Sequence, residues 1–74
     1  MSTFDRVKAI LKDHLDISDI AEDTNLETVF SNDSYERLMI SLDLEDEFGV
    51  NISDSEMDRI KTAGDLVRLV DPNH

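Results

Sequence analysis

The chain has 74 residues, of which 18 are acidic and seven are Lys or Arg, with no cysteine and a formal net charge of −11. This length leaves room for one domain, which we expect over residues 1–74 with its core at about 4–70, and little room for a deep catalytic pocket. The composition excludes disulfides and thiolate metal sites, and the negative charge disfavours nucleic acids and anionic membranes as partners.

The first residues lead directly into charged side chains at Asp5 and Arg6, without the apolar core of a signal peptide. No apolar stretch approaches the ~18 residues that a membrane span needs. We therefore expect a cytoplasmic protein without a membrane span. Its acidic surface should attract proteins that carry basic patches.

The first predicted helix runs from about residue 4 to residue 15, with Ser2 or Thr3 as its N-cap. Its apolar side chains recur with helical spacing and form one stripe. Residues 16–33 show no sustained period and are rich in Asp, Ser, Thr and Asn, so we predict a long structured loop there. Loops of this length are uncommon and often functional.

A second helix is predicted from Asp33 or Ser34 to about Phe48, where Gly49 can adopt the left-handed conformation that ends helices. Leu38, Leu42 and either Leu44 or Glu45 follow its helical spacing. The fold class that we predict is all-α, a small bundle of three longer helices and one short helix.

The short helix is expected at residues 56–60 behind a cap formed by residues 53–56, and Thr62 should open the last helix. There Thr62 and Asp65 resemble a capping box in which Asp replaces Glu. The buried face of this last helix should carry Leu66 and Val70, together with neighbouring apolar residues.

Acidic residues are concentrated in the second half of the chain. Residues 33–58 contain one base, Arg37, and the following acids: Asp33, Glu36, Asp43, Glu45, Asp46, Glu47, Asp54, Glu56 and Asp58. A solvated face that keeps the protein in solution is one interpretation of this run, and a surface for basic partners is the other.

The sequence offers no arrangement typical of catalysis or of a metal site. An EF-hand aligned on Gly49 fails because Leu44 and Phe48 would stand where oxygen ligands are required. The histidines His14 and His74 lie near opposite ends of the chain, and we interpret His14 as an ordinary helix residue. Ser34 has no histidine at a recognisable spacing, and without further context the preceding Asp and Ser indicate only a helix cap.

Residues 4–70 resemble the acyl carrier protein family. The segment 33–48 carries the likeness, since it is similar to the family's Asp-Ser-Leu motif followed by an acidic, apolar-striped helix that ends in Phe. Segments 50–54 and 62–66 match the family in order and spacing. Segment 23–26 is similar to the loop that precedes the motif.

The resemblance implies that a phosphopantetheinyl transferase attaches 4′-phosphopantetheine from coenzyme A to Ser34. Asp33 would assist by helping to hold Mg²⁺, which is needed only during modification. The protein would be a monomeric, non-catalytic carrier of acyl or aminoacyl thioesters for loading ligases and synthases of fatty-acid, lipid or secondary-metabolite biosynthesis. The partner-docking residues that the resemblance implies are Tyr35, Glu36, Arg37, Leu38, Ser41, Glu45 and Asp46.

Several positions depart from the family pattern. Ser31 stands where the family usually has Gly, Tyr35 where it has Leu, and Asp43 where a small residue is common, while Arg37 adds a positive charge to the expected docking face. We interpret these differences as signs of a specialised carrier. An acidic interaction module that is never modified, and a regulatory protein that binds divalent cations, are the alternatives.

Overall fold

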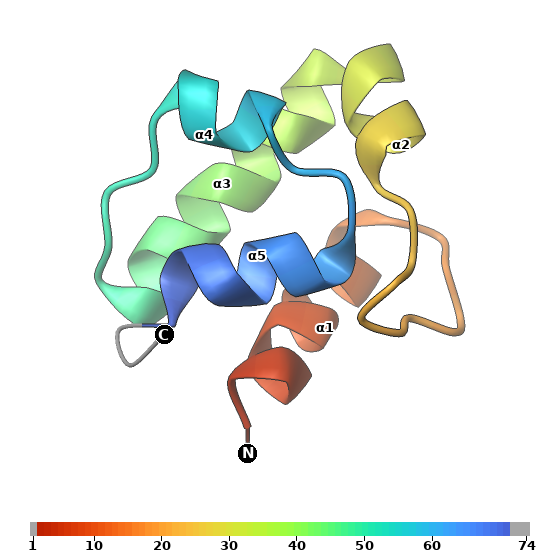
Figure 1. Ribbon diagram of the computed structural model, residues 1–74, viewed down its shortest axis with the longest axis horizontal. Helices are drawn as coiled ribbons and strands as arrows, with labels where there is room; N and C mark the ends of the chain where they lie inside the picture. Colours follow the sequence, from red (N-terminus) through yellow and green to blue (C-terminus); the bar gives the residue numbers. More distant parts are fainter. Residues whose placement is uncertain (1, 72–74) are drawn as a thin grey trace.

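The computed structural model describes residues 2–71 of the chain (Figure 1). Within these residues the backbone forms five helices: α1 (Thr3–His14), α2 (Glu27–Asn32), α3 (Ser34–Phe48), α4 (Asp54–Asp58) and α5 (Ala63–Val70). The predicted all-α fold is therefore confirmed, as are three longer helices and a long connection after the first. His74, one of the two histidines considered above, lies outside the described residues.

Helix α1 begins one residue earlier than predicted because Ser2 caps it. The Ser2 hydroxyl accepts a hydrogen bond from the Asp5 amide, and the Asp5 carboxylate accepts one from the Ser2 amide, which completes a capping box. Val7 and Leu11, one turn apart, are fully buried. This stripe packs α1 against both α3 and α5.

The prediction of a loop throughout residues 16–33 was wrong at its end, where the chain forms α2. The helix has six residues, fewer than two turns, so it cannot display the sustained period by which a sequence reveals a helix. It is held by tertiary contacts, because Leu26 and Phe30 place their side chains in the core one turn apart. Burial of two such side chains stabilises the fold by about 3–6 kcal/mol, enough to impose a short helix.

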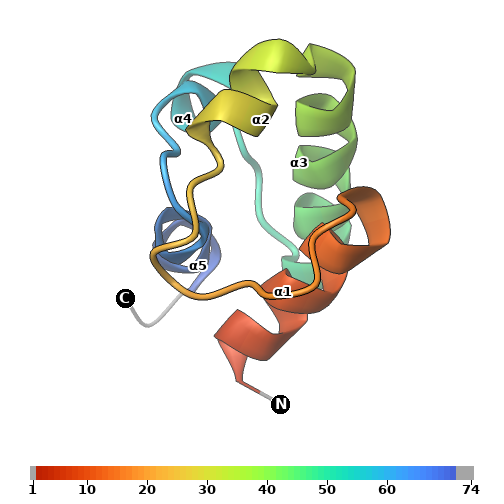
Figure 2. The same cartoon turned by 90° about the vertical axis from the view of Figure 1, so that its right-hand side faces the viewer.

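The rest of the long connection is fastened to the start of α5 (Figure 2). The amides of Ala63 and Gly64 donate to the carbonyls of Thr24 and Glu22, at 3.1 and 2.7 Å, and the amide of Leu26 donates to the Lys61 carbonyl at 2.8 Å. A Cβ atom on Gly64 would lie 3.0 Å from the Glu22 carbonyl oxygen. A side chain at this close approach of two backbones would have to push the Glu22 carbonyl aside.

Helix α3 has the predicted bounds but turns a different face to the core. Ile40 and Leu44 are fully buried, whereas Leu38 and Leu42 are each 47 % exposed. The spacing of Leu38 and Leu42 is helical, yet it describes a second stripe on the outside of the helix rather than the packed one. Gly49 ends the helix with φ +66°, in the left-handed region as predicted.

Helix α4 lies two residues earlier than the predicted 56–60. Ser53 is its N-cap, and the Glu56 carboxylate accepts from the Ser53 amide, so the first turn consists of the residues expected to precede it. Helix α5 opens as predicted with Thr62 and Asp65 in a capping box. Leu66 and Val70 are buried on its inner face.

The helices enclose one hydrophobic core, which α1, α3 and α5 surround with α2 and α4 lying across one end (Figure 2). The buried apolar residues are Val7, Leu11, Ile20, Leu26, Phe30, Ile40, Leu44, Met57, Ile60, Ala63, Leu66 and Val70. Among residues 2–71, the structure has no helix of the length and apolarity that crossing a bilayer requires.

Candidate functional site

The junction of α2 and α3 consists of a single residue, Asp33. Its amide donates to the Val29 carbonyl at 3.0 Å and closes α2, while its carboxylate accepts the Glu36 amide at 3.0 Å and caps α3. The chain therefore turns sharply between the two helices. Ser34, the first residue of α3, lies exposed at this corner.

The start of α3 presents backbone amides to a group attached at Ser34. The Glu36 amide donates a hydrogen bond to the Asp33 carboxylate. The amides of Ser34 and Tyr35 lie in the first turn of α3, where backbone amides have no hydrogen-bond acceptor within the helix. The dipole of this 15-residue helix adds positive potential at the same end. A phosphate ester on the Ser34 hydroxyl would lie beside these amides without crossing any packed side chain.

Nothing in the described part of the chain would make Ser34 a nucleophilic catalyst. Across residues 2–71, no side chain forms a hydrogen bond to its hydroxyl, whereas an activated serine needs a base within about 2.6–3.2 Å. Ser34 can thus serve as an acceptor of a group brought by another protein.

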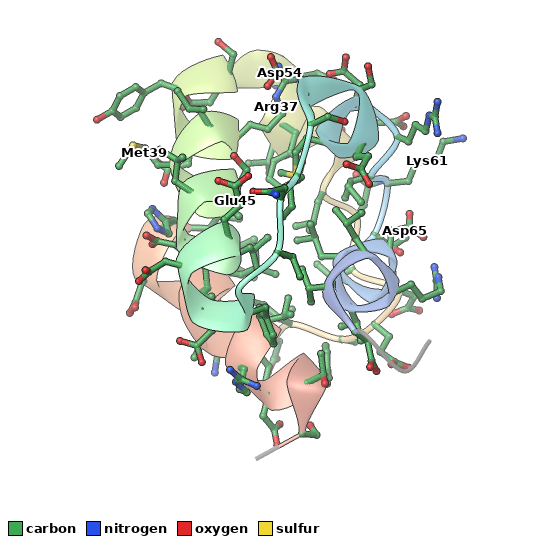
Figure 3. The ribbon with its side chains drawn as sticks, turned by 90° about the vertical axis from the view of Figure 1, so that its left-hand side faces the viewer. Arg37, Met39, Glu45, Asp54, Lys61 and Asp65 are labelled. Atoms are coloured by element: carbon green, nitrogen blue, oxygen red, sulfur yellow. The ribbon has the colours of Figure 1, made fainter. Side chains whose placement is uncertain are left out.

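Beyond Ser34, the outer face of α3 exposes three large apolar side chains. Tyr35 is 68 % exposed, and Leu38 and Leu42 follow it at helical spacing on the same side of the helix. Met39 extends outward from the neighbouring face (Figure 3). The sequence analysis named Tyr35 and Leu38 as expected docking residues and did not expect Leu42 to be exposed, because its spacing was equally consistent with a core position.

Three of the predicted docking residues have roles within the fold. Ser41 is 7 % exposed, and its hydroxyl donates to the Leu38 carbonyl at 2.7 Å, so its side chain is not available to a partner. Arg37 extends toward α4 and pairs with Asp58. Glu45 points toward the segment between α3 and α4, where it accepts the Ile52 amide at 2.8 Å (Figure 3). Of the remaining acids predicted for docking, Asp46 is exposed and Glu36 is partly buried.

His14 is not the ordinary helix residue that the sequence indicated. Its side chain is 18 % exposed and lies between two carboxylates of α3, with Nδ1 2.7 Å from Glu36 and Nε2 2.5 Å from Asp43. The hydrogen bond to Asp43 raises the His14 pKa above its ordinary 6.5; burial opposes this shift, and Glu36 supports it. These partners lie 22 and 29 residues away, so no local pattern could have revealed the cluster.

The His14 cluster does not resemble a metal centre, because the two carboxylates take opposite ring nitrogens and do not converge on one point. Over residues 2–71, no group of three His, Cys, Asp or Glu side chains is placed to hold a metal ion. Several acids of the second half are instead committed to helix caps and backbone amides, as Glu56 and Glu45 are.

We compared the chain with models of known protein families. A family model described as phosphopantetheine attachment site matches residues 5–70. The chain belongs to this family. It is therefore a non-catalytic carrier domain, and membership implies a 4′-phosphopantetheine prosthetic group, a transferase that installs it and enzymes that use it. The resemblance inferred from residues 4–70 is confirmed.

Proposed function

We propose that Ser34 is the residue that carries the phosphopantetheine arm. The observation that supports this proposal most directly is the position of its hydroxyl, exposed at a corner of the fold and at the positive end of α3. The arm supplies a terminal thiol that holds acyl groups as thioesters. The protein contributes a rigid attachment point and a surface that partner enzymes recognise.

Asp33 would assist the transferase while its carboxylate remains the cap of α3. One oxygen, Oδ1, accepts the Glu36 amide at 3.0 Å, which leaves the other available to a Mg²⁺ ion brought with coenzyme A. The metal would be needed only during modification. Asp33→Asn should keep the cap, since Asn caps helices as well as Asp does, while slowing attachment.

The test is the intact mass of the protein after incubation with coenzyme A, Mg²⁺ and a broad-specificity phosphopantetheinyl transferase. We expect one arm on the wild-type protein and none on Ser34→Ala. Ser31→Ala is the matched control, because Ser31 is also exposed and lies one helical turn away across the junction. Wild-type protein that gains no arm, or Ser34→Ala protein that still gains one, would overturn the assignment. The first outcome would favour an interaction module that is never modified.

We further propose that partners dock on the outer face of α3 through Tyr35, Leu38 and Leu42, with Asp46 and Glu36 at the acidic margin. A partner that fits has an apolar groove bordered by Lys or Arg, so its affinity should fall as the salt concentration rises. Asp46→Lys should weaken binding to the transferase. Asp19→Lys, an equal charge change in the long connection, should have a smaller effect; equal losses in the two variants would show that only net charge matters.

The pathway that we propose is a specialised branch of fatty-acid, lipid or secondary-metabolite biosynthesis, served by a dedicated acyl or aminoacyl ligase. The support comes from Arg37, which extends from α3 to Asp58, and from the exposed Tyr35 beside the attachment residue. We expect the carrier to act in the cytoplasm as a monomer. The mass of the loaded carrier isolated from its native cells tests the cargo, and an unloaded or long-chain acyl form would contradict this proposal.

A further inference from the structure

A second row of side chains runs along α3 beside the apolar row formed by Tyr35, Leu38 and Leu42. Each of its members directly follows a residue of the apolar row, and they are Glu36, Met39 and Asp43. Successive residues are rotated by about 100° around a helix, so the second row lies on the flank of the face that we propose for docking. This flank turns toward α1, because His14 contacts both of its acids.

The His14 imidazole balances the charge of these two acids. Nδ1 lies 2.7 Å from Glu36 and Nε2 lies 2.5 Å from Asp43, so the protonated ring donates to both. The Asp43 side chain is nevertheless 50 % exposed, and that of Glu36 is 23 % exposed, so a partner can approach them. One positive and two negative charges leave the cluster with a net charge of −1, which becomes −2 when His14 loses its proton.

The charged groups that act on the His14 ring come from α3. They are Asp43 and Glu36, and their effect exceeds that of burial, so the pKa of His14 lies above its ordinary 6.5. Helix α5 also packs against α1, but its charged residues Asp65 and Arg68 pair with each other. The ring is therefore charged at about pH 6 and loses its proton as pH rises through the higher value.

We propose that His14 sets how strongly the carrier binds basic partners, because its proton withholds Glu36 and Asp43 from the partner's Lys or Arg side chains. The inference rests on the docking surface proposed above and extends that surface to the flank of α3 beside α1. A partner that recognises this flank has a basic side chain that reaches past the apolar row toward α1. For such a partner, loss of the His14 proton frees two acids and raises the affinity.

This proposal predicts a different sign from a purely structural role of His14. Loss of the proton weakens the link between α1 and α3, and a weaker link between helices would leave docking unchanged or make it poorer. Release of the two acids instead improves docking. One elementary charge close to a partner's charge, in partly screened surroundings, changes the affinity by roughly threefold.

The test measures the affinity of the carrier for a broad-specificity phosphopantetheinyl transferase at about pH 6 and about pH 8.5. All proteins carry Ser34→Ala, which removes the proposed attachment hydroxyl and limits the measurement to binding. His14→Gln is neutral at both pH values, and His14→Lys is charged at both. Variants are compared at the same pH, so titration of the transferase and of His74 cancels. Circular dichroism first establishes that each variant is helical at each pH.

At about pH 6, we expect His14→Gln to bind roughly threefold more tightly than its parent and His14→Lys to bind like the parent. At about pH 8.5, His14→Gln should bind like the parent and His14→Lys roughly threefold more weakly. Asp46 is exposed and forms no ion pair within residues 2–71, so Asp46→Asn should weaken binding by the same factor at both pH values. Ratios for the two His14 variants that stay constant with pH, or weaker binding by His14→Gln at about pH 6, would overturn the inference.

A second measurement needs no substitution at His14. A partner that binds the neutral form more tightly must lower the pKa of His14, because the coupling between two binding equilibria is reciprocal. The NMR signal of the His14 imidazole should therefore titrate at a lower pH in the complex than in the free protein, with His74→Gln used to assign the other histidine. An unchanged or raised pKa in the complex would refute the proposal.

The outcome is separable from the assignment of Ser34. Intact mass of the wild-type protein reports modification, and the binding ratios report the role of His14. If the transferase binds the carrier at neither pH, the docking proposal has failed, and this inference fails with it.

Discussion

Replacing His14 by Gln tests a link between α1 and α3 that the sequence analysis did not predict. Protonated His14 donates to Glu36 and Asp43, and so links α1 to two positions of α3 that lie about two helical turns apart. Glutamine is similar in length and uncharged, so Gln removes the charge with little change in packing. We compare the free energy of unfolding of the wild-type protein and of His14→Gln in urea, at about pH 5.5 and about pH 8.5.

The expected loss in the free energy of unfolding depends on how exposed the two carboxylates are. Glu36 is 23 % exposed, and a hydrogen bond to a charged group in such a position contributes about 1.5 kcal/mol. Asp43 is 50 % exposed, and solvent screening reduces its contribution to about 0.5 kcal/mol. We therefore expect His14→Gln to lose about 2 kcal/mol near pH 5.5, where the imidazole is charged.

The sign of the pH dependence is fixed by the raised pKa of His14, caused mainly by its hydrogen bond to Asp43. The stabilisation is fully present below the ordinary value of 6.5 and is lost as pH rises through the higher pKa of the folded protein. At about pH 8.5 a neutral imidazole can donate through only one nitrogen, so the loss in the variant should shrink to about 0.5 kcal/mol. His74→Gln, outside the described residues, controls for titration of the other histidine.

The comparison between variant and wild type at each pH cancels the titration of the remaining acids, which both proteins share. A loss of stability that is the same at both pH values would refute the charged bridge, because an uncharged contact does not depend on pH. A larger loss at the higher pH would show that His14 is neutral in the folded protein, contrary to the geometry.

Three further predictions concern the backbone contacts and caps. Gly64→Ala should lower the free energy of unfolding by about 1–2 kcal/mol in chemical denaturation, because its Cβ would press on the Glu22 carbonyl; an unchanged midpoint would contradict the close approach. Ser53→Ala should cost about 1 kcal/mol by the same measurement through loss of the α4 cap, and no cost would show that α4 is held by packing alone. The hydrogen bond from the Lys61 amide lowers the pKa of Asp65, and burial partly opposes this shift. The ionised carboxylate therefore stabilises the fold above the ordinary pKa of 3.8, and this stabilisation is lost as pH falls through the lower pKa of the folded protein. In Asp65→Asn, the free energy of unfolding should consequently fall less steeply as the pH is lowered.

The sequence predicted the helix bounds best where capping residues punctuate the chain. Asp33 and Gly49 bracket α3, and both ends lie where predicted, because a side-chain cap and a left-handed stop act locally. The sequence failed at α2, where no cap side chain stands at Leu26 and the helix depends on burial of Phe30. Tertiary packing of this kind leaves no local signal.

Some features of the candidate site could be predicted from the sequence, and others could not. Asp33 and Ser34 could be identified from the sequence because they belong to a motif of adjacent residues. Residues that are adjacent in the sequence lie close together in every fold. The pairing of Arg37 with Asp58 and the burial of Ser41 were not identifiable, since both depend on the rotation of α3 about its own axis. Helical periodicity predicts that a helix has an apolar face. Helix α3 has two apolar stripes, and only the packed structure shows which of them faces the core.

The three backbone hydrogen bonds between the long connection and the start of α5 affect how the chain can be made. A ribosome that has synthesised the sequence only as far as α4 has produced the serine and its helix, yet Thr24, Glu22 and Leu26 still lack the amides and carbonyl that fix them. We therefore expect the nascent first half to be less stable than the same residues in the complete chain. Stable folding would then follow synthesis of the final helical segment.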